Sequence, residues 1–191
     1  MADYYYLVST LPLLQLKDAP GTTYDQFLQD CSMWLSAGEM KQVSNARIDI
    51  ENISLEEVKN GMLWNWIVFE NSIRNELVKI RAANVGTSPD SYLRKHIEND
   101  PSIVSLIRDV AKESSPYKAE LSLLDVRWDF LSNSEVGHYF DVTALILYSL
   151  KLQLLARKEL FHVEKGQKVF HIIYEGNKDE EERKYRENNG R

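Results

Sequence analysis

Glycine and proline are scarce in this sequence, whose 191 residues include only 8 Gly and 5 Pro. All-β sandwiches and barrels need many turns, and these two residue types form most of them, so their scarcity favours long helices. Cysteine is scarcer still. The single Cys31 excludes an intrachain disulfide, which fits a reducing compartment.

Long apolar runs and basic clusters are missing as well. The most apolar stretch, 142–156, is too short to span a bilayer and is interrupted by Ser149, Lys151 and Gln153. The N-terminus lacks the basic start and apolar core of a signal peptide. A net charge of −6 argues against the basic face that nucleic-acid binding needs, and no basic run would hold an anionic membrane. We therefore expect a cytoplasmic protein with no nucleic-acid partner and no direct membrane span.

Apolar residues at helical spacing are the strongest positive signal. One stripe recurs every three or four positions between residues 55 and 80: Leu55, Val58, Met62, Trp66, Phe69, Ile73, Leu77 and Ile80. This pattern predicts a long helix that starts at a capping box, Ser54–Glu57, and ends at Gly86. A second long helix is predicted after Asp141, as its cap, and runs to about Phe161. Its apolar positions wrap most of the circumference, so we expect it to be the most buried element.

Shorter elements fill the rest of the chain. Thr22 or Thr23 is expected to cap a helix that stops at Gly38, followed by a short helix over 39–44. Further helices are predicted over 91–98, from Asp100-Pro101 with Ile103, Leu106, Ile107 and Val110 buried, and from Pro116 with Leu121, Leu124, Trp128 and Leu131 on one face. Extended character is expected over 4–16, with a helical turn as the alternative, and over 47–53.

Together these patterns predict an all-α, multi-helix bundle with two long helices and a short extended segment near the N-terminus. One helical domain is expected over residues 1–176. Residues 177–191 contain no aliphatic side chain and are expected to form a charged solvated tail. The predicted core includes Trp66, Phe69, Ile73, Trp128, Leu145 and Leu152. Trp64 falls off the stripe and is a candidate for a second helix or a partner surface.

Signatures of catalysis are absent from the sequence. It has no glycine-rich phosphate loop and no nucleophile elbow. Its four histidines, His96, His138, His162 and His171, share no metal-ligand spacing, and Cys31 lies on an apolar stripe where a buried structural thiol is expected. We therefore predict no catalytic, cofactor-binding or metal-binding residues, and an interaction subunit rather than an enzyme.

One polar cluster stands out on the long helix. Glu70, Arg74 and Arg81 share a face with Leu77, and Asn75 and Glu76 flank it. An exposed ladder of ion pairs is one interpretation, worth a few tenths of a kcal/mol per pair. The other is a polar joint that holds this helix against another helix or a partner, with Glu70, Arg74, Asn75 and Arg81 as its residues. Arg74 is assigned a structural role, and the role of Arg81 is left open.

Three segments carry a resemblance to a known family. They are Tyr4–Pro12 (YYYLVSTLP), Phe69–Ala82 (FENSIRNELVKIRA), and a C-terminal set comprising Tyr139–Asp141 (YFD), Tyr148–Leu154 (YSLKLQL) and Glu164–Gly166 (EKG). Together they resemble a bacterial family of uncharacterised proteins encoded among V/A-type ATPase subunits. That family is more weakly similar to the family of C (or d) subunits of these ATPases.

The resemblance implies an all-helical, non-catalytic protein. Members of the C (d) family form a socket between the central rotor shaft and the membrane ring, so the implied partners are those ATPase subunits and the implied place is peripheral, on the cytoplasmic side. This chain is much shorter than a typical member of that family, whose helical unit is repeated three times. The implied function is a C-subunit-like adapter that takes part in ion transport, or alternatively a helical assembly or regulatory factor.

Overall fold

The computed structural model describes residues 4–53, 58, 61–94 and 101–161. The chain forms two compact units, Met1–Ala156 and Arg157–Arg191. Of the second unit only residues 157–161 are described, so the predicted tail at 177–191 lies outside the described residues, as do His96, His162 and His171.

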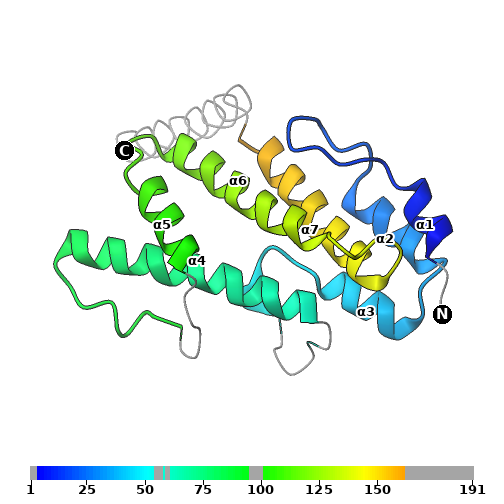
Figure 1. Cartoon of the computed structure of the whole chain (residues 1–191), viewed down its shortest axis with the longest axis horizontal. Coiled ribbons are helices and arrows are strands. Elements are labelled where there is room, and N and C mark those ends of the chain that lie inside the picture. The colour runs from blue at the N-terminus through cyan, green and yellow to red at the C-terminus, as the bar shows by residue number, and fades with distance from the viewer. Residues whose placement is uncertain (1–3, 54–57, 59–60, 95–100, 162–191) are drawn as a thin grey trace, which may run out of the picture. The chain divides into compact units, whose positions relative to one another are not determined.

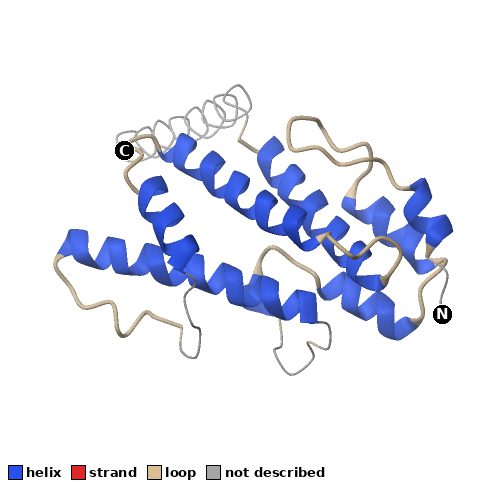
Figure 2. Ribbon diagram, in the orientation of Figure 1, coloured by secondary structure: helices blue, strands red, loops and turns tan. Residues whose placement is uncertain are grey.

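Helices make up the whole regular structure of the described residues (Figures 1 and 2). They are α1 (Tyr5–Thr10), α2 (Tyr24–Ser32), α3 (Ala37–Asn45), the 3-10 helix η1 (Ile50–Asn52), α4 (Gly61–Val85), α5 (Pro101–Val110), α6 (Pro116–Ser134) and α7 (Val142–Glu159). Within these ranges no strand is present. The predicted all-α class is confirmed, and α4 and α7 are the two long helices that the apolar stripes indicated.

The core of the first unit lies where α4 meets α6 and α7. Trp66 of α4 is fully buried, and its ring centroid lies 5.7 Å from that of Phe69 and 6.1 Å from that of Phe130 on α6. Phe69 and Phe130 stack at 3.9 Å. Leu145 and Leu152 of α7 are buried as well. Five of the six predicted core residues are therefore confirmed, and the aromatic rings join α4 to α6.

The backbone of residues 46–48, between α3 and η1, connects the two long helices α4 and α7 through hydrogen bonds. The indole Nε1 of Trp66 donates a hydrogen bond to the carbonyl oxygen of Arg47 at 3.1 Å. From α7, Gln153 Nε2 donates to the carbonyl oxygen of Ala46 at 2.6 Å, and Gln153 Oε1 accepts from the backbone N–H of Ile48 at 3.3 Å. Irregular backbone buried between two helices needs such partners, and Trp66 and Gln153 supply them.

The two ends of α4 show how far local sequence determines where a helix begins and ends. At its C-terminus, Gly86 has a φ of 73°, and the N–H groups of Gly86 and Thr87 donate to the carbonyl oxygens of Ala83 and Ala82. This is a Schellman motif, so the predicted stop at Gly86 is confirmed. The start differs from the prediction, because Val58 is not helical and α4 begins at Gly61. Gly61 has a low helix propensity, so it is better suited to the end of a helix than to its interior. The predicted capping box at 54–57 lies outside the described residues.

Capping side chains begin four of the other helices. Thr23 accepts from the N–H of Gln26 at α2, Ser115 from that of Lys118 at α6, and Asp141 from that of Ala144 at α7. A complete capping box, Ser36 with Glu39, starts α3. The prediction that Gly38 ends the preceding helix is therefore wrong. Because Ser36 caps a new helix, α2 ends at Ser32 and Gly38 lies inside α3.

Two segments predicted to be extended contain helical turns. Tyr5–Thr10 forms α1, and Ile50–Asn52 forms η1. In α1 the residue types favour a strand, but burial of Tyr4 and Leu7 fixes the turn against the bundle, so tertiary packing overrides local propensity. In contrast, of the helix predicted over 91–98, residues 91–94 form only a turn and a bend, and residues 95–98 lie outside the described residues.

Burial differs from prediction on the two helices that pack beside α4. On α5, which contacts both α4 and α6 (Figure 1), Ile107 is fully buried but Leu106 is 49% exposed. On α6, Trp128 is only half-buried. Its ring instead covers the ammonium group of Lys151, whose Nζ lies 4.8 Å from the ring centroid. Lys151 is buried, and its Nζ also pairs with Glu135 Oε2 at 2.6 Å. The indole of Trp128 therefore lies beside an ion pair at the edge of the core.

Three titratable groups of the first unit have raised pKa values: Tyr4 before α1, Cys31 of α2 and Tyr148 of α7. Burial, aided by the hydrogen bond to Glu39 and the charge of Glu39, raises the pKa of Tyr4 to about 12. Burial, aided by the charge of Asp30, raises the pKa of Cys31 to about 12. The pKa of Tyr148 rises to about 12, first from burial and then from the charges of Asp30 and Cys31. All three groups therefore favour their neutral forms in the folded protein.

The first prediction compares two tryptophans on α4. We expect Trp66→Ala to lower the free energy of unfolding by about 3–5 kcal/mol, because it opens a cavity and removes the bond to Arg47. Trp64→Ala, two residues away and 47% exposed, is the matched control and should change it by less than about 0.5 kcal/mol. Urea unfolding followed by circular dichroism measures both, and equal losses would contradict the described core.

The second prediction concerns alkaline pH. In the unfolded chain the thiol and the two phenols ionise near their ordinary pKa values of 9.0 and 10.0, whereas the folded values are about 12. Folding stability should thus be unaffected by these groups below pH 9 and should fall as pH rises from 9 toward 12. Tyr4→Phe removes one titration and should make the decline less steep above pH 10. Urea midpoints measured across this range would contradict the assignment if they stayed constant to pH 12.

Candidate functional site

Buried polar residues are concentrated in the middle of α4. Between positions 70 and 76 the side chains of Glu70, Asn71, Ser72, Asn75 and Glu76 are all buried. Buried polar groups lose their hydrogen bonds to water, so each needs a partner within the protein. This polar segment, Glu70–Glu76, overlaps the predicted polar cluster and lies within the segment with the most specific family resemblance.

Glu70 pairs with Arg127 across the interface between α4 and α6. Arg127 Nε donates to Glu70 Oε1 at 2.5 Å, and Arg127 Nη2 donates to Glu70 Oε2 at 3.2 Å. Burial lowers the pKa of Arg127, but the charge and hydrogen bonds of Glu70 and the charge of Glu120 outweigh it and raise that pKa. The pair is therefore a bidentate contact, and Glu70 is only 1% exposed. An exposed ladder does not describe it.

Glu76 has a similar role less than two turns further along α4. Its Oε1 accepts from Arg108 Nε on α5 at 3.1 Å, and its Oε2 accepts from Lys79 Nζ at 3.2 Å. The carboxylate is almost fully buried while both cations reach it from more exposed positions. Glu76 thus connects α4 to α5 through a long arginine side chain that lies along the surface.

The two asparagines of the polar segment bind Arg94 in the loop after α4. Asn75 Nδ2 donates to the carbonyl oxygen of Arg94 at 3.1 Å, and Asn75 Oδ1 accepts from its N–H at 2.9 Å. Arg94 Nη1 donates to Asn71 Oδ1 at 2.7 Å. Asn75, a predicted site residue, therefore pairs with the backbone of Arg94 as another peptide group would, and this holds the loop against the helix.

Arg74 joins the polar segment to the region before α4. Its Nη1 lies 2.8 Å from Glu51 Oε1, which also accepts from Arg94 Nη2 at 3.1 Å, and its Nη2 lies 3.9 Å from Asp49 Oδ1. Glu51 and Asp49 are mostly exposed. Solvent screens such pairs, so Arg74 contributes much less to stability than Arg127 does.

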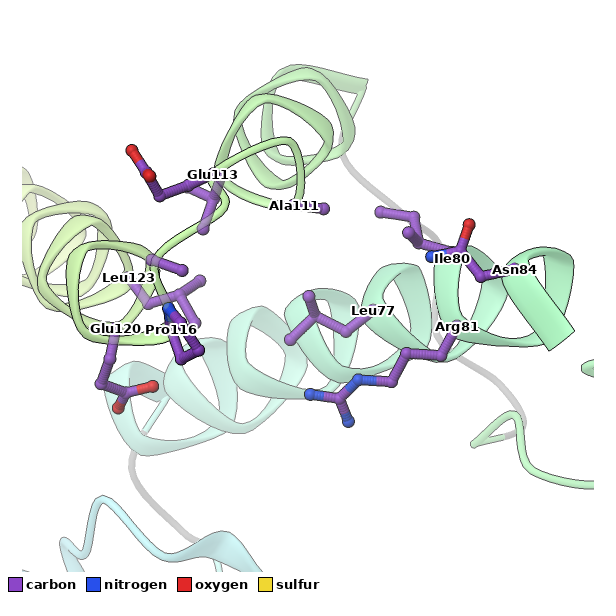
Figure 3. A pocket seen from close by; sticks show the side chains of 11 residues that line it. Leu77, Ile80, Arg81, Asn84, Ala111, Glu113, Pro116, Glu120 and Leu123 are labelled. Carbon is purple, nitrogen blue, oxygen red and sulfur yellow. The ribbon is translucent and has the colours of Figure 1, made fainter.

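Arg81 is separated from this network. Its side chain is exposed, and among the described residues it makes no hydrogen bond or ion pair. It borders a pocket of about 330 Å³ between α4, the end of α5 and the start of α6. Figure 3 shows Leu77 and Ile80 of α4 facing Ala111 and Leu123 across this pocket, with Arg81 and Glu120 at its edge. The structure thus places Glu70 in a separate pair with Arg127, and it joins Arg74 and Asn75 through Glu51 and Arg94. Arg81 lies beside a pocket lined by both apolar and polar side chains.

Sequence reasoning missed Arg127, Arg94 and Arg108. For Arg127 a signal was available, because it follows Leu123 and precedes Leu131 by four residues each and so lies on the apolar face of α6. A charge on such a face implies a buried partner. For Arg94 and Arg108 no such signal exists, since a loop and an exposed helix position both accommodate arginine without one.

Reactive groups are few among the described residues. The raised pKa of Cys31 keeps its buried thiol protonated, and a thiol rather than a thiolate is a poor nucleophile. His138 Nδ1 lies 2.6 Å from Asp141 Oδ2, where both residues support the start of α7. Within the described ranges no group of three or more His, Cys, Asp or Glu side chains is arranged to hold a metal ion. The polar segment therefore has a clear mechanical consequence, which is to fix α4 against α5, α6 and two loops.

Comparison with known proteins gives no match: no family model, no curated protein and no solved structure matches this chain. Over the residues that the structure describes, no helix combines the length and apolar character needed to cross a membrane.

The third prediction tests the buried pair. We expect Arg127→Met to lower the free energy of unfolding by about 3–5 kcal/mol, because it leaves the Glu70 carboxylate buried without a cation. Adding Glu70→Leu to that variant should recover most of the loss, since both charges are then gone. Arg74→Met, which breaks an exposed pair, serves as the control and should cost less than about 1 kcal/mol. Urea unfolding provides the measurement, and equal costs for the two arginines would contradict a special role for the buried pair.

Proposed function

We propose that this chain is a non-catalytic peripheral subunit of a V/A-type ATPase. It would act as a C-subunit-like adapter between the rotor shaft and the membrane ring, on the cytoplasmic side, and take part in ion transport. The resemblance of three segments to proteins encoded with these ATPases gives the class of complex. The alternative is a helical assembly or regulatory factor for the same ATPase.

The observation that best supports an adapter is the way α4 is fixed. An adapter that passes torque must resist bending and sliding of its helices. Glu70, Glu76 and Asn75 tie α4 to α6, to α5 and to the loop at Arg94 through directional hydrogen bonds. Packed apolar side chains alone allow more alternatives, whereas bidentate and charge-assisted bonds select one arrangement. A helix fixed in this way is suited to transmitting force.

Arg81 and its pocket are the proposed contact with another component of the ATPase. The pocket offers the apolar side chains of Leu77, Ile80 and Leu123 beside a cation that has no ion-pair partner among the described residues. An apolar patch next to an arginine is a common composition for the centre of a protein interface.

The fourth prediction uses co-purification. Tagged wild-type chain, isolated from native membranes in mild detergent, should retain the ATPase subunits in stoichiometric amounts. Arg81→Glu should keep the wild-type melting temperature but lose most of the bound subunits, because it replaces the positive charge that would face the partner with a negative one. Arg47→Glu is the matched control, because Arg47 is also an exposed arginine but lies outside the pocket, and should co-purify normally.

The outcomes separate the two proposed roles. Stoichiometric recovery of the assembled ATPase supports a permanent subunit. Recovery of only incompletely assembled ATPase, with none of the complete complex, supports the assembly factor. The absence of every ATPase subunit from the wild-type preparation would reject both.

A further inference from the structure

An exposed group of aromatic side chains spans three elements at one end of the bundle. We call it the aromatic face: Tyr5 and Tyr6 of α1, Trp34 after α2, and Tyr139 and Phe140 in the loop before α7, with Met33 beside them. The ring centroids of Tyr5 and Phe140 lie 4.8 Å apart, and those of Tyr6 and Trp34 lie 5.4 Å apart. The two ring pairs start from adjacent residues of α1, so both lie around this one short helix.

Single exposed apolar residues are normal on protein surfaces, but five exposed aromatic side chains gathered on three neighbouring elements are not. Tyrosine, tryptophan, phenylalanine and methionine are the residue types enriched where proteins bind one another. The rings gain contact with each other while their outer faces remain in water. This arrangement leaves a large apolar area that binding would remove from solvent.

The backbone beneath the aromatic face is firmly held. On α1, Leu7 is buried and the hydroxyl of Tyr4 donates a hydrogen bond to the carboxylate of Glu39 on α3. The segment after α1 is fixed by Tyr148, whose hydroxyl donates to the carbonyl oxygen of Pro12 at 3.0 Å. Because the rings are positioned before any partner arrives, binding costs less conformational entropy than ordering a mobile segment would.

Three carboxylates lie close to the aromatic face, and within the described part of the chain few basic residues accompany them. Asp30 lies one turn before Trp34, Glu39 bonds to Tyr4, and Asp141 follows Phe140. Hydrogen bonds from Ser36 and then from Tyr4 lower the pKa of Glu39, so its negative charge is retained. Residues 4–40 contain one basic residue, Lys17, and residues 128–150 contain no Lys or Arg. Lys41 and Lys151 follow these two ranges directly, and Lys151 is buried and paired with Glu135. The surface is therefore apolar at its centre and negative at its rim.

We propose that the aromatic face is a docking site for a basic amphipathic helix of a partner protein, one with an apolar stripe flanked by lysine or arginine. The stripe would cover the rings of Tyr6, Trp34 and Phe140, and the cations would lie over the acidic rim. Charge complementarity of this kind selects the partner and speeds its association. A second copy of this chain would bring a second acidic rim against the first, and an anionic lipid surface would be repelled for the same reason.

This docking site stands independently of the proposed ATPase function. The Arg81 pocket and the aromatic face are built from different residues, and neither argument uses the other. An adapter needs two separate surfaces, which these would provide, but a basic amphipathic helix could belong to any partner.

The test uses the full chain and two synthetic amphipathic peptides of equal length. One has leucine on one face and lysine on the other, and the second has glutamate in place of lysine. Fluorescence anisotropy of labelled peptide should show binding of the lysine peptide, weaker at high salt, and no binding of the glutamate peptide. The Tyr6→Ser, Trp34→Ser double variant should weaken binding by about tenfold or more.

A matched double variant controls for the loss of aromatic side chains in general. Tyr92 is 69% exposed against 65% for Tyr6, and Trp64 is 47% exposed against 49% for Trp34, but neither belongs to the aromatic face. Tyr92→Ser with Trp64→Ser should therefore leave binding unchanged. All three proteins should have the same melting temperature, because every substituted side chain is exposed.

Each other outcome overturns the proposal. Equal binding by the two double variants would show that the peptide is held elsewhere on the acidic chain. Binding of the glutamate peptide would show that the acidic residues do not select a basic partner. Binding to lipid vesicles, neutral or anionic, that the Tyr6 and Trp34 substitutions abolish would make the face a membrane site instead. A concentration-dependent dimer that the same substitutions disrupt would make it a self-association surface.

Discussion

A carboxylate on the core side of α4 must meet a cation, and Arg127 of α6 is that cation. Water cannot solvate Glu70 at this depth, so the ion pair fixes the register of α4 against α6 to within a hydrogen-bond length. Phe69 directly precedes Glu70, while Trp66 and Phe130 lie about one turn from Glu70 and Arg127, and their ring contacts add apolar burial to that register. A shift of either helix by one residue would separate the charges and the rings together.

The surrounding contacts extend this constraint to the rest of the first unit. Glu76 binds α4 to α5, and Asn75 binds it to the loop at Arg94. Trp66 of α4 and Gln153 of α7 both bind the backbone of residues 46–48, which connects these two helices. These bonds have directions, and apolar packing does not, so the network selects one arrangement among several that would bury similar area. That selection is the physical property the proposed adapter would need, and it explains how a helix so rich in polar side chains packs stably against its neighbours.

The surfaces left over have different characters. Near the C-terminal end of α4, Arg81 lies beside a pocket, and around α1 two pairs of exposed rings lie close to acidic residues. Neither feature contributes to the buried network. Exposed rings and an exposed cation beside apolar side chains add little to folding, since water still covers them. Their arrangement is more readily explained by association than by stability.

Local sequence determined much of this fold. The period of apolar residues set the two long helices and most of the core, and Thr23, Gly86 and Asp141 set helix ends through bonds within a few residues. Tertiary structure decided the rest. Side chains far apart in sequence turned the Tyr5–Thr10 segment into a helix and moved Trp128 to the edge of the core. They also gave Glu70 and Arg74 different roles, although both lie on one face of α4. A periodic pattern shows which residues share a face, but it does not show what lies opposite. Only the packing of α6 against α4 placed Arg127 on Glu70, and only the solvent around Glu51 left Arg74 with a weak pair.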